Sequence, residues 1–213
     1  MEMIGESCLL WQLGTGPSLA NTQRVHRTYQ RLERARAEGR LEVYDVVPAY
    51  DSLAIHFDPL AIEVDRLQAQ VETWLDETTN DSKGHDDSAA VQTVTLPVNY
   101  DGPDLQRVAD HAGLNAAEVV ARHTAPTYTV AAIGFIPHFP YLLGLDPSLA
   151  TPRLGSPRVR VSAGAVGIGG DQTGVYPQDS PGGWNLIGTT DPERLQALRP
   201  GDGLRFAASE GRA

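Results

Sequence analysis

The 213-residue sequence contains one cysteine, Cys8, and no long hydrophobic run. A single cysteine forms no intramolecular disulfide and excludes a multi-cysteine metal site, so the chain fits a reducing compartment. No apolar run approaches the roughly 18 residues that span a bilayer. Residues 1–14 lack the basic region and the small-residue cleavage site of a signal peptide. We therefore expect a cytoplasmic protein that has no membrane partner.

Basic residues are also scarce, with 17 lysines and arginines against 27 aspartates and glutamates and a formal net charge of -10. A chain this acidic repels phosphate backbones, and its one basic stretch is the short helix face around Arg31, Arg34 and Arg36. Hydrophobic residues make up 41% of the chain and charged residues 21%, which is the composition of a globular protein. We expect a folded protein that does not bind nucleic acid.

Several self-contained catalytic motifs are missing. The chain has no G-x-S-x-G nucleophile motif and no Walker A loop, and no histidine pair has the i, i+4 spacing of a helical zinc site. Gly167-Ile168-Gly169 opens like a dinucleotide fingerprint, but Gln172 replaces its third glycine and Pro177 prevents a following helix. No residue is committed to proton transfer, so the sequence leaves the catalytic residues unknown and indicates no metal site.

The first part of the chain alternates between strand and helix patterns. An apolar stretch over residues 8–13 is followed by helical spacing over 19–32 and by two strand patterns over 41–47 and 52–57. Pro48-Ala49-Tyr50 is the expected turn between those strands. With a second helix, this order forms most of a ferredoxin-like split βαβ unit.

The second helix is expected to begin with Asp58 as N-cap and Pro59 at its first position. A polar run that contains glycine and serine follows it and cannot bury enough apolar surface to order itself. We therefore predict an α+β domain over residues 1–75, a linker over 76–90 and a second domain over 91–213.

The second domain is predicted to be mainly β. A half-buried strand pattern covers 91–98, and two short helices follow, one beginning near Pro103 and one capped by Asn115 with Glu118 in a capping box. From Thr127 onward, glycine and proline recur between short strand patterns, as is typical of a β-barrel or sandwich.

Four turn segments rich in glycine and proline carry most of the aromatic and polar candidates. They are GFIPHFPYL (134–142), TPRLGSPR (151–158), GGDQTGVYP (169–177) and SPGGWNLIG (180–188). Their order and spacing, together with Gly144-Leu145-Asp146-Pro147, resemble the 5-oxoprolinase B-subunit family. That family is also described as Kip-type kinase inhibitors, as allophanate hydrolase subunit 1 and as carboxyltransferase domains.

This resemblance implies an N-terminal α+β domain followed by a cyclophilin-like β-barrel domain. It implies a protein that is inactive alone, forms half of a composite cleft with a C-subunit homologue, and also acts with a LamB-type A-subunit homologue. Together these would open the lactam of 5-oxoproline to glutamate, with ATP as the cofactor used through the complex. Two alternatives stay open: a regulatory inhibitor that binds a sensor histidine kinase, and a carboxyltransferase module of a urea-carboxylase-like system.

The same resemblance, read with the chemistry of a small, flat, polar substrate, gives the candidate site. Phe135, Phe139 and Tyr141 would form aromatic walls, and prolines such as Pro137 would keep the turn rigid. Arg153 and Arg158 would bind a carboxylate or phosphate. The other expected binding residues are Gln172 as amide partner, His123, Tyr176, and Gly182 and Gly183 beside Trp184.

Each candidate also has a structural interpretation. The aromatic residues equally suit a barrel core, and the two arginines equally suit a solvated surface or salt bridges to Asp146 and Asp179. His123 equally suits the C-terminal end of a helix. The family has glycine where this chain has His138, so a positive φ there would strain the histidine or shift the turn.

Overall fold

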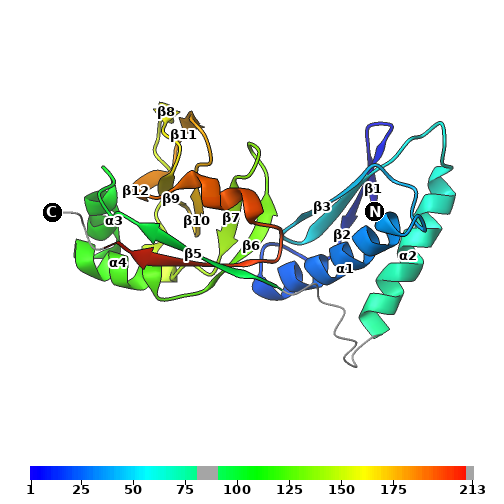
Figure 1. Cartoon of the computed structure of the whole chain (residues 1–213), viewed down its shortest axis with the longest axis horizontal. Helices are drawn as coiled ribbons and strands as arrows, with labels where there is room; N and C mark the ends of the chain where they lie inside the picture. Colours follow the sequence, from blue (N-terminus) through cyan, green and yellow to red (C-terminus); the bar gives the residue numbers. More distant parts are fainter. Residues whose placement is uncertain (81–90, 210–213) are drawn as a thin grey trace. The chain divides into compact units, whose positions relative to one another are not determined.

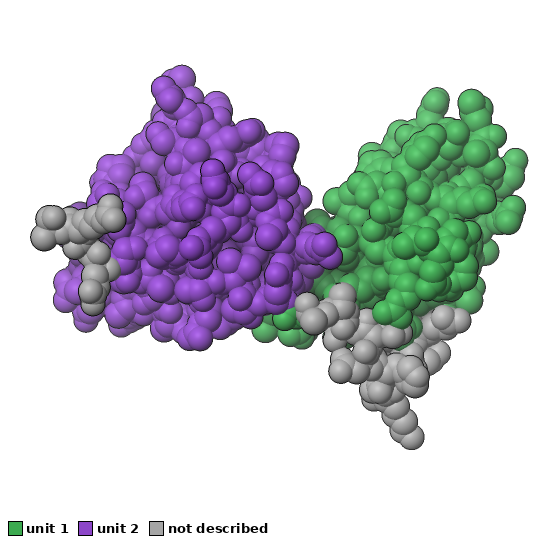
Figure 2. All heavy atoms as spheres, in the orientation of Figure 1, with its two compact units in different colours: residues 1–91 green, residues 92–213 purple. Residues whose placement is uncertain are grey.

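The computed structural model describes residues 1–80 and 91–209, without the side chains of 76–80. The chain forms two compact units, residues 1–91 and 92–213 (Figures 1 and 2). Most of the predicted linker, residues 81–90, lies outside the described residues, and the helix before it continues to Asn80. No helix in the described part is long and apolar enough to cross a membrane.

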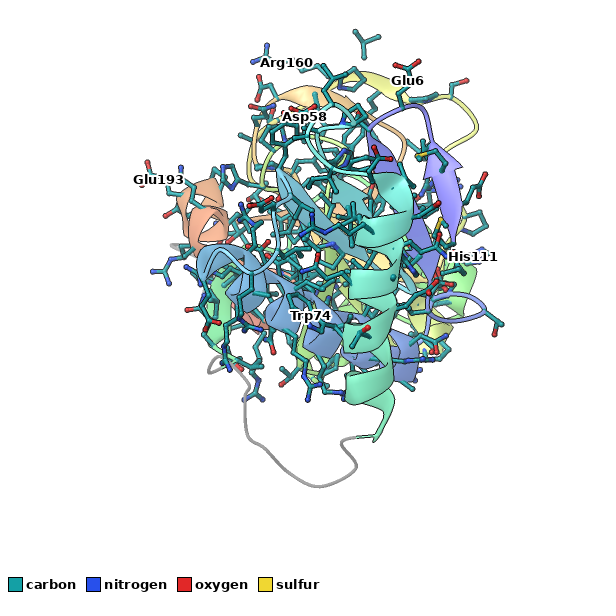
Figure 3. All side chains as sticks on the ribbon, turned by 90° about the vertical axis from the view of Figure 1, so that its right-hand side faces the viewer. Glu6, Asp58, Trp74, His111, Arg160 and Glu193 are labelled. Atoms are coloured by element: carbon teal, nitrogen blue, oxygen red, sulfur yellow. The ribbon has the colours of Figure 1, made fainter. Side chains whose placement is uncertain are left out.

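The first unit is a four-stranded antiparallel sheet with two helices. Its strands, in the spatial order β1-β2-β4-β3, are β1 (Glu2–Ile4), β2 (Cys8–Gln12), β4 (Ser52–His56) and β3 (Asp45–Ala49). Alternate strand residues such as Leu9 and Ile55 are fully buried in one core with Val25 of α1 (Leu19–Ala37) and Leu67 of α2 (Val64–Asn80). Trp74 packs against this core, and the Arg40 guanidinium lies 5.4 Å from its ring centre (Figure 3).

The α+β prediction is confirmed for this unit, but the ferredoxin-like arrangement is not. The strands around α1 adopt the expected order β2-β4-β3. The edge position beside β2 is filled by β1, which precedes β2 in a hairpin, whereas a ferredoxin-like unit would place a strand after α2 there.

Two local predictions in this unit are wrong. Pro48 and Ala49 of the predicted turn belong to β3, where proline is tolerated because β3 is an edge strand, and the turn itself comes at Tyr50 and Asp51. The helix expected at Pro59 begins at Val64, because the Asp58 carboxylate accepts the Leu60 N–H at 2.9 Å and forms a local turn instead of a helix cap.

The second unit is a seven-stranded sheet that nearly closes into a barrel. In spatial order its strands are β12 (Asn185–Thr189), β9 (Ala165–Gly169), β10 (Gln172–Val175), β7 (Pro140–Leu143), β6 (Tyr128–Ile133), β13 (Gly203–Ala208) and β5 (Thr93–Val98). Neighbouring strands are antiparallel except the parallel pair β13 and β5. A bridge between Asn99 and Thr189 connects the two edge strands.

Shorter elements surround this barrel. They are α3 (Leu105–Ala112), α4 (Ala116–Thr124), the 3₁₀ helices η1 (Pro147–Leu149) and η2 (Pro192–Ala197), and the two-stranded ribbon of β8 (Arg158–Val161) and β11 (Ser180–Gly182). The predicted capping box of α4 is confirmed, because Asn115 and Glu118 each accept the backbone N–H of the other.

The strands β9 and β10 separate two hydrophobic clusters. Val166, Ile168 and Val175 belong to the main core, whereas Tyr176 belongs to a second cluster with Phe139, Trp184 and Leu186. Because successive strand residues point to opposite faces of a sheet, Gly167, Gly169 and Gly174 face the second cluster.

His123 lies in the main core. Its ring is fully buried, stacks on Phe206 at 4.5 Å between ring centres, and is hydrogen-bonded at both nitrogens. The Thr173 hydroxyl donates to the Gly167 carbonyl, so it accepts from Nε2–H of His123 at 2.9 Å, and Tyr100 donates its hydroxyl hydrogen to Nδ1 at 2.8 Å. Burial lowers the pKa of His123 to about 3 and keeps the imidazole neutral.

We expect this histidine to make the protein less stable in acid. Its pKa is about 3 when folded against an ordinary value of 6.5, so the unfolded chain binds the proton first. Its contribution is complete above pH 6.5 and falls toward pH 3, by up to about 1.4 kcal/mol per pH unit. Urea unfolding at about pH 7.5 and about pH 5 should show a smaller loss of stability for His123→Gln than for the wild type. Equal losses in the two proteins would contradict this.

Candidate functional site

The second unit contains a pocket of about 360 Å³ beside the ribbon of β8 and β11. Five of its lining residues are aromatic, and one, Arg153, is charged. The lining residues are Phe135, Phe139, Tyr141, Arg153, Leu154, Pro157, Tyr176, Pro181, Gly182, Gly183 and Trp184. All come from the four turn segments, so the structure brings these segments together around one pocket.

The floor of the pocket is the Trp184 indole lying on glycines. A Cβ at Gly169 would sit 2.5 Å from the indole Nε1, and one at Gly174 would sit 3.1 Å from its ring. A Cβ at Gly167 would lie 3.2 Å from the Trp184 Cβ. These strand residues therefore lack side chains where the ring lies. Gly167 and Gly169 belong to β9, which agrees with the rejection of a dinucleotide loop from the sequence.

Phe139 is the centre of the aromatic walls. It is 2% exposed and makes edge contacts with Phe135, Tyr176 and Trp184 at 5.7, 5.2 and 5.5 Å between ring centres. Tyr141 tilts against the same ring at 4.9 Å. Such a cluster of rings gives rigid walls and a flat apolar surface for a ligand.

The polar groups of the pocket are two phenols and one cation. Burial raises the pKa of Tyr176 and of Tyr141, so both phenols stay protonated at neutral pH, although nearby Arg153 partly opposes each shift. The exposed Arg153 guanidinium lies 5.8 Å from the centre of the Trp184 ring. The pocket therefore offers hydroxyl hydrogen bonds and one positive charge beside an indole face.

Arg158 supports the pocket from outside. One of its terminal nitrogens donates to both Asp104 carboxylate oxygens at 2.7 and 2.8 Å, and the other donates to the Trp184 carbonyl at 3.3 Å. The same carboxylate accepts the Leu186 N–H at 2.7 Å. Arg158 thus connects β8 to the start of α3 and to β12, and its partner is neither Asp146 nor Asp179; the latter pairs with Arg160.

Eight of the twelve predicted binding residues line the pocket, and four do not. Arg158 is in the ion pair with Asp104, and His123 lies in the main core on the opposite face of β10. Gln172 pairs with Gly169 at the start of β10, and Pro137 is exposed in its turn. The residues that the sequence missed are Leu154, Pro157 and Pro181, and their one signal was membership of the same turn segments.

The turn between β6 and β7 has an unusual backbone. Phe135 has a φ of 67° and His138 a φ of 65°, so of the two outcomes considered for His138 the structure shows the strained histidine. The Ile136 N–H donates to the Gly134 carbonyl at 2.8 Å, and the Phe139 N–H donates to the Ile136 carbonyl at 3.2 Å. These bonds form a γ-turn at Phe135 and a β-turn with His138 where glycine is preferred. Each such residue costs about 1–2 kcal/mol.

Among the described residues, no group of three or more histidine, cysteine, aspartate or glutamate side chains is placed to hold a metal ion. The pocket lining contains no carboxylate, histidine or cysteine either. The arrangement is therefore suited to bind a small planar anion, and it supplies no group of its own that would act as a general base near neutral pH.

The chain has recognisable relatives. The family profile described as "Carboxyltransferase domain, subdomain C and D" matches residues 1–199. The protein named as the 5-oxoprolinase B subunit of Escherichia coli O157:H7 is 38% identical, over 96% of this chain and 93% of its own length. Its namesake in Bacillus subtilis (strain 168) is 34% identical, over 97% and 91%.

Solved structures agree on the fold. The protein TTHA0988 matches with a TM-score of 0.80 and 38% identity over 96% of this chain, which spans 40% of the length of TTHA0988. The urea carboxylase of Kluyveromyces lactis matches with a TM-score of 0.74 at 19% identity, covering 95% of this chain and 21% of its own, and this likeness concerns the fold alone.

We predict that Gly169→Ala destabilises the protein by about 1–3 kcal/mol, because its new methyl group overlaps the Trp184 indole in a buried site. Urea unfolding measures the loss, and the tryptophan emission spectrum reports the displaced ring. Gly155→Ala is the matched control, since a Cβ there meets nothing within 4 Å. Equal effects of the two substitutions would contradict the glycine floor.

We also predict that Arg158 stabilises the folded protein and that Arg153 does not. Arg158→Met leaves the mostly buried Asp104 carboxylate unpaired and should lower the free energy of unfolding by on the order of 3 kcal/mol. Arg153→Met changes an exposed side chain and should have little effect on stability. Urea unfolding of both variants tests this contrast, and a larger loss for Arg153→Met would refute it.

Proposed function

The chain belongs to the family of carboxyltransferase domains, subdomains C and D, and to its group of 5-oxoprolinase B subunits, and on this basis we propose that it is the B subunit of an ATP-dependent 5-oxoprolinase. It acts in the cytoplasm and converts 5-oxoproline to glutamate together with a C-subunit homologue and a LamB-type A-subunit homologue. We also propose that residues 91–213 form a cyclophilin-like barrel domain, which follows the N-terminal α+β domain predicted over residues 1–75.

The observation that carries this proposal is the chemistry of the pocket. 5-Oxoproline is a small flat lactam with one carboxylate. In this proposal its ring packs against Trp184, its carboxylate pairs with Arg153, and its amide bonds to the hydroxyls of Tyr141 and Tyr176, all of which line the pocket. A pocket of about 360 Å³ is in the usual range for a small ligand.

The same chemistry supports a protein that is inactive alone. Tyr141 and Tyr176 have raised pKa values and stay protonated, so neither phenol acts as a base. The one charged group in the pocket lining is the Arg153 guanidinium. The residues that handle ATP and move protons in the reaction therefore belong to the partner subunits in this proposal. This chain binds and orients the lactam.

A carboxyltransferase module of a urea-carboxylase-like system is the second candidate, favoured by the fold shared with the Kluyveromyces lactis urea carboxylase. The two candidates differ in the charge of the ligand. Urea is neutral and offers Arg153 no negative charge to pair with, whereas 5-oxoproline is an anion, so the cation in the pocket lining favours the first candidate.

The test is to co-purify the chain with its C-subunit homologue and its A-subunit homologue, and to measure glutamate formed from 5-oxoproline with and without ATP. We expect ATP-dependent activity of the complex. Arg153→Gln should raise KM for 5-oxoproline about 10- to 100-fold, because a charge-assisted hydrogen bond contributes about 1.5–3 kcal/mol.

Arg160→Gln is the matched control, because Arg160 is 76% exposed, pairs with Asp179 and projects outward on the surface (Figure 3). Its KM should equal that of the wild type. A wild-type complex that forms no glutamate would refute the proposed function. An unchanged KM in Arg153→Gln would refute the role of Arg153 alone.

A further inference from the structure

Phe135 stands apart from the other aromatic residues of the pocket. Its side chain is 61% exposed, whereas Phe139, Tyr176 and Trp184 are at most 5% exposed. It also has a φ of 67°, in the left-handed region that a bulky side chain rarely adopts. An exposed apolar ring and a strained backbone each cost free energy in the unbound protein, and Phe135 has both.

The strain is maintained by the surrounding turn. Gly134 donates its N–H to the Phe139 carbonyl at 3.1 Å and accepts from Ile136, so the residues on both sides of Phe135 are fixed by hydrogen bonds. Strained residues held in this way are concentrated at ligand-binding sites, where the surrounding structure determines their geometry.

The position of the ring links it to the ligand. Phe135 lines the pocket, and its ring meets Phe139 edge to face at 5.7 Å with an angle of 83° between the planes. Its inner side therefore rests on the aromatic wall, while the rest of the ring is left to water. A ligand that fills the pocket against Trp184 would cover apolar surface of Phe135 and gain contact area with it.

Resting on the function proposed above, we propose that Phe135 is a specificity-determining residue that covers the bound ligand at the mouth of the pocket. The ligand class is a planar ring that carries an amide and a carboxylate: the ring lies between Phe135 and Trp184, and the carboxylate reaches Arg153. The strained turn holds the aromatic ring in place before the ligand arrives, which reduces the entropy lost on binding.

The test compares Phe135→Ala and Phe135→Gly in the complete complex with the C-subunit homologue and the A-subunit homologue. Both remove the ring and should raise KM for 5-oxoproline about 10-fold, with kcat within about twofold of the wild type. The two variants separate the effect of losing the ring from the effect of backbone strain, because glycine adopts the observed φ at position 135 freely and alanine does not. Phe135→Gly should therefore melt at a higher temperature than Phe135→Ala while binding equally weakly.

Tyr44→Ala is the matched control, because Tyr44 is 66% exposed and lies in the first unit, outside this pocket. Its KM should be unchanged. An unchanged KM in Phe135→Ala, or KM values that follow the melting temperatures of the two variants, would overturn the inference. Loss of co-purification with the C-subunit homologue in Phe135→Ala would also overturn it, since the ring would then serve a protein contact.

A second measurement separates this inference from the proposed function. In the chain with Trp11→Phe and Trp74→Phe, Trp184 is the remaining tryptophan, and the Trp11 indole N–H has no hydrogen-bond partner to lose. This variant is titrated with 5-oxoproline and with 2-imidazolidone-4-carboxylate, another flat cyclic amide anion, while the fluorescence of Trp184 is recorded.

If the second compound changes the fluorescence, and Phe135→Ala weakens that response about 10-fold, the inference holds even when the complex does not hydrolyse 5-oxoproline. If the complex hydrolyses 5-oxoproline with the same KM in Phe135→Ala, the proposed function holds and the inference fails. If neither compound changes the fluorescence and 5-oxoproline is not hydrolysed, both fail.

Discussion

The contact between the Trp184 indole and the side-chain-free surface of β9 and β10 is the constraint on which the pocket depends. An indole can lie flat on a sheet only where the strand residues beneath it lack a Cβ, and Gly167, Gly169 and Gly174 provide that surface. The ring then supports Phe139 and the Arg153 guanidinium. Arg158 fixes the other side of Trp184 by binding its carbonyl and Asp104. The aromatic walls and the charge of the pocket therefore share one support.

The two faces of β10 explain why residues close in sequence have different roles. Thr173 and Gly174 are adjacent, yet one bonds to His123 in the main core and the other lies beneath Trp184. The alternation of a strand requires this separation. A neutral histidine with both ring nitrogens hydrogen-bonded lies on the inner face, while the outer face lies beneath the aromatic residues that line the pocket.

The sequence predicted features that depend on a few consecutive residues, and it also identified the four turn segments that lie around the pocket. The capping box at Asn115 depends on four consecutive residues, and the turn segments converge because the strands between them are adjacent in the sheet. Arg158 was misassigned because its partner Asp104 is 54 residues away, a distance that no local pattern spans. Asp58 was misassigned because its carboxylate bonds equally well in a turn and in a helix cap.

The position of β13 has a consequence for how the protein is made. Residues 203–208 lie between β5 and β6, so the earliest strand of the barrel gains its ladder partner from the latest one. During translation, β5 leaves the ribosome more than a hundred residues before β13. The facing edges of β5 and β6 therefore stay unpaired until residues 203–208 have been made, and the barrel closes only after β13 has been made.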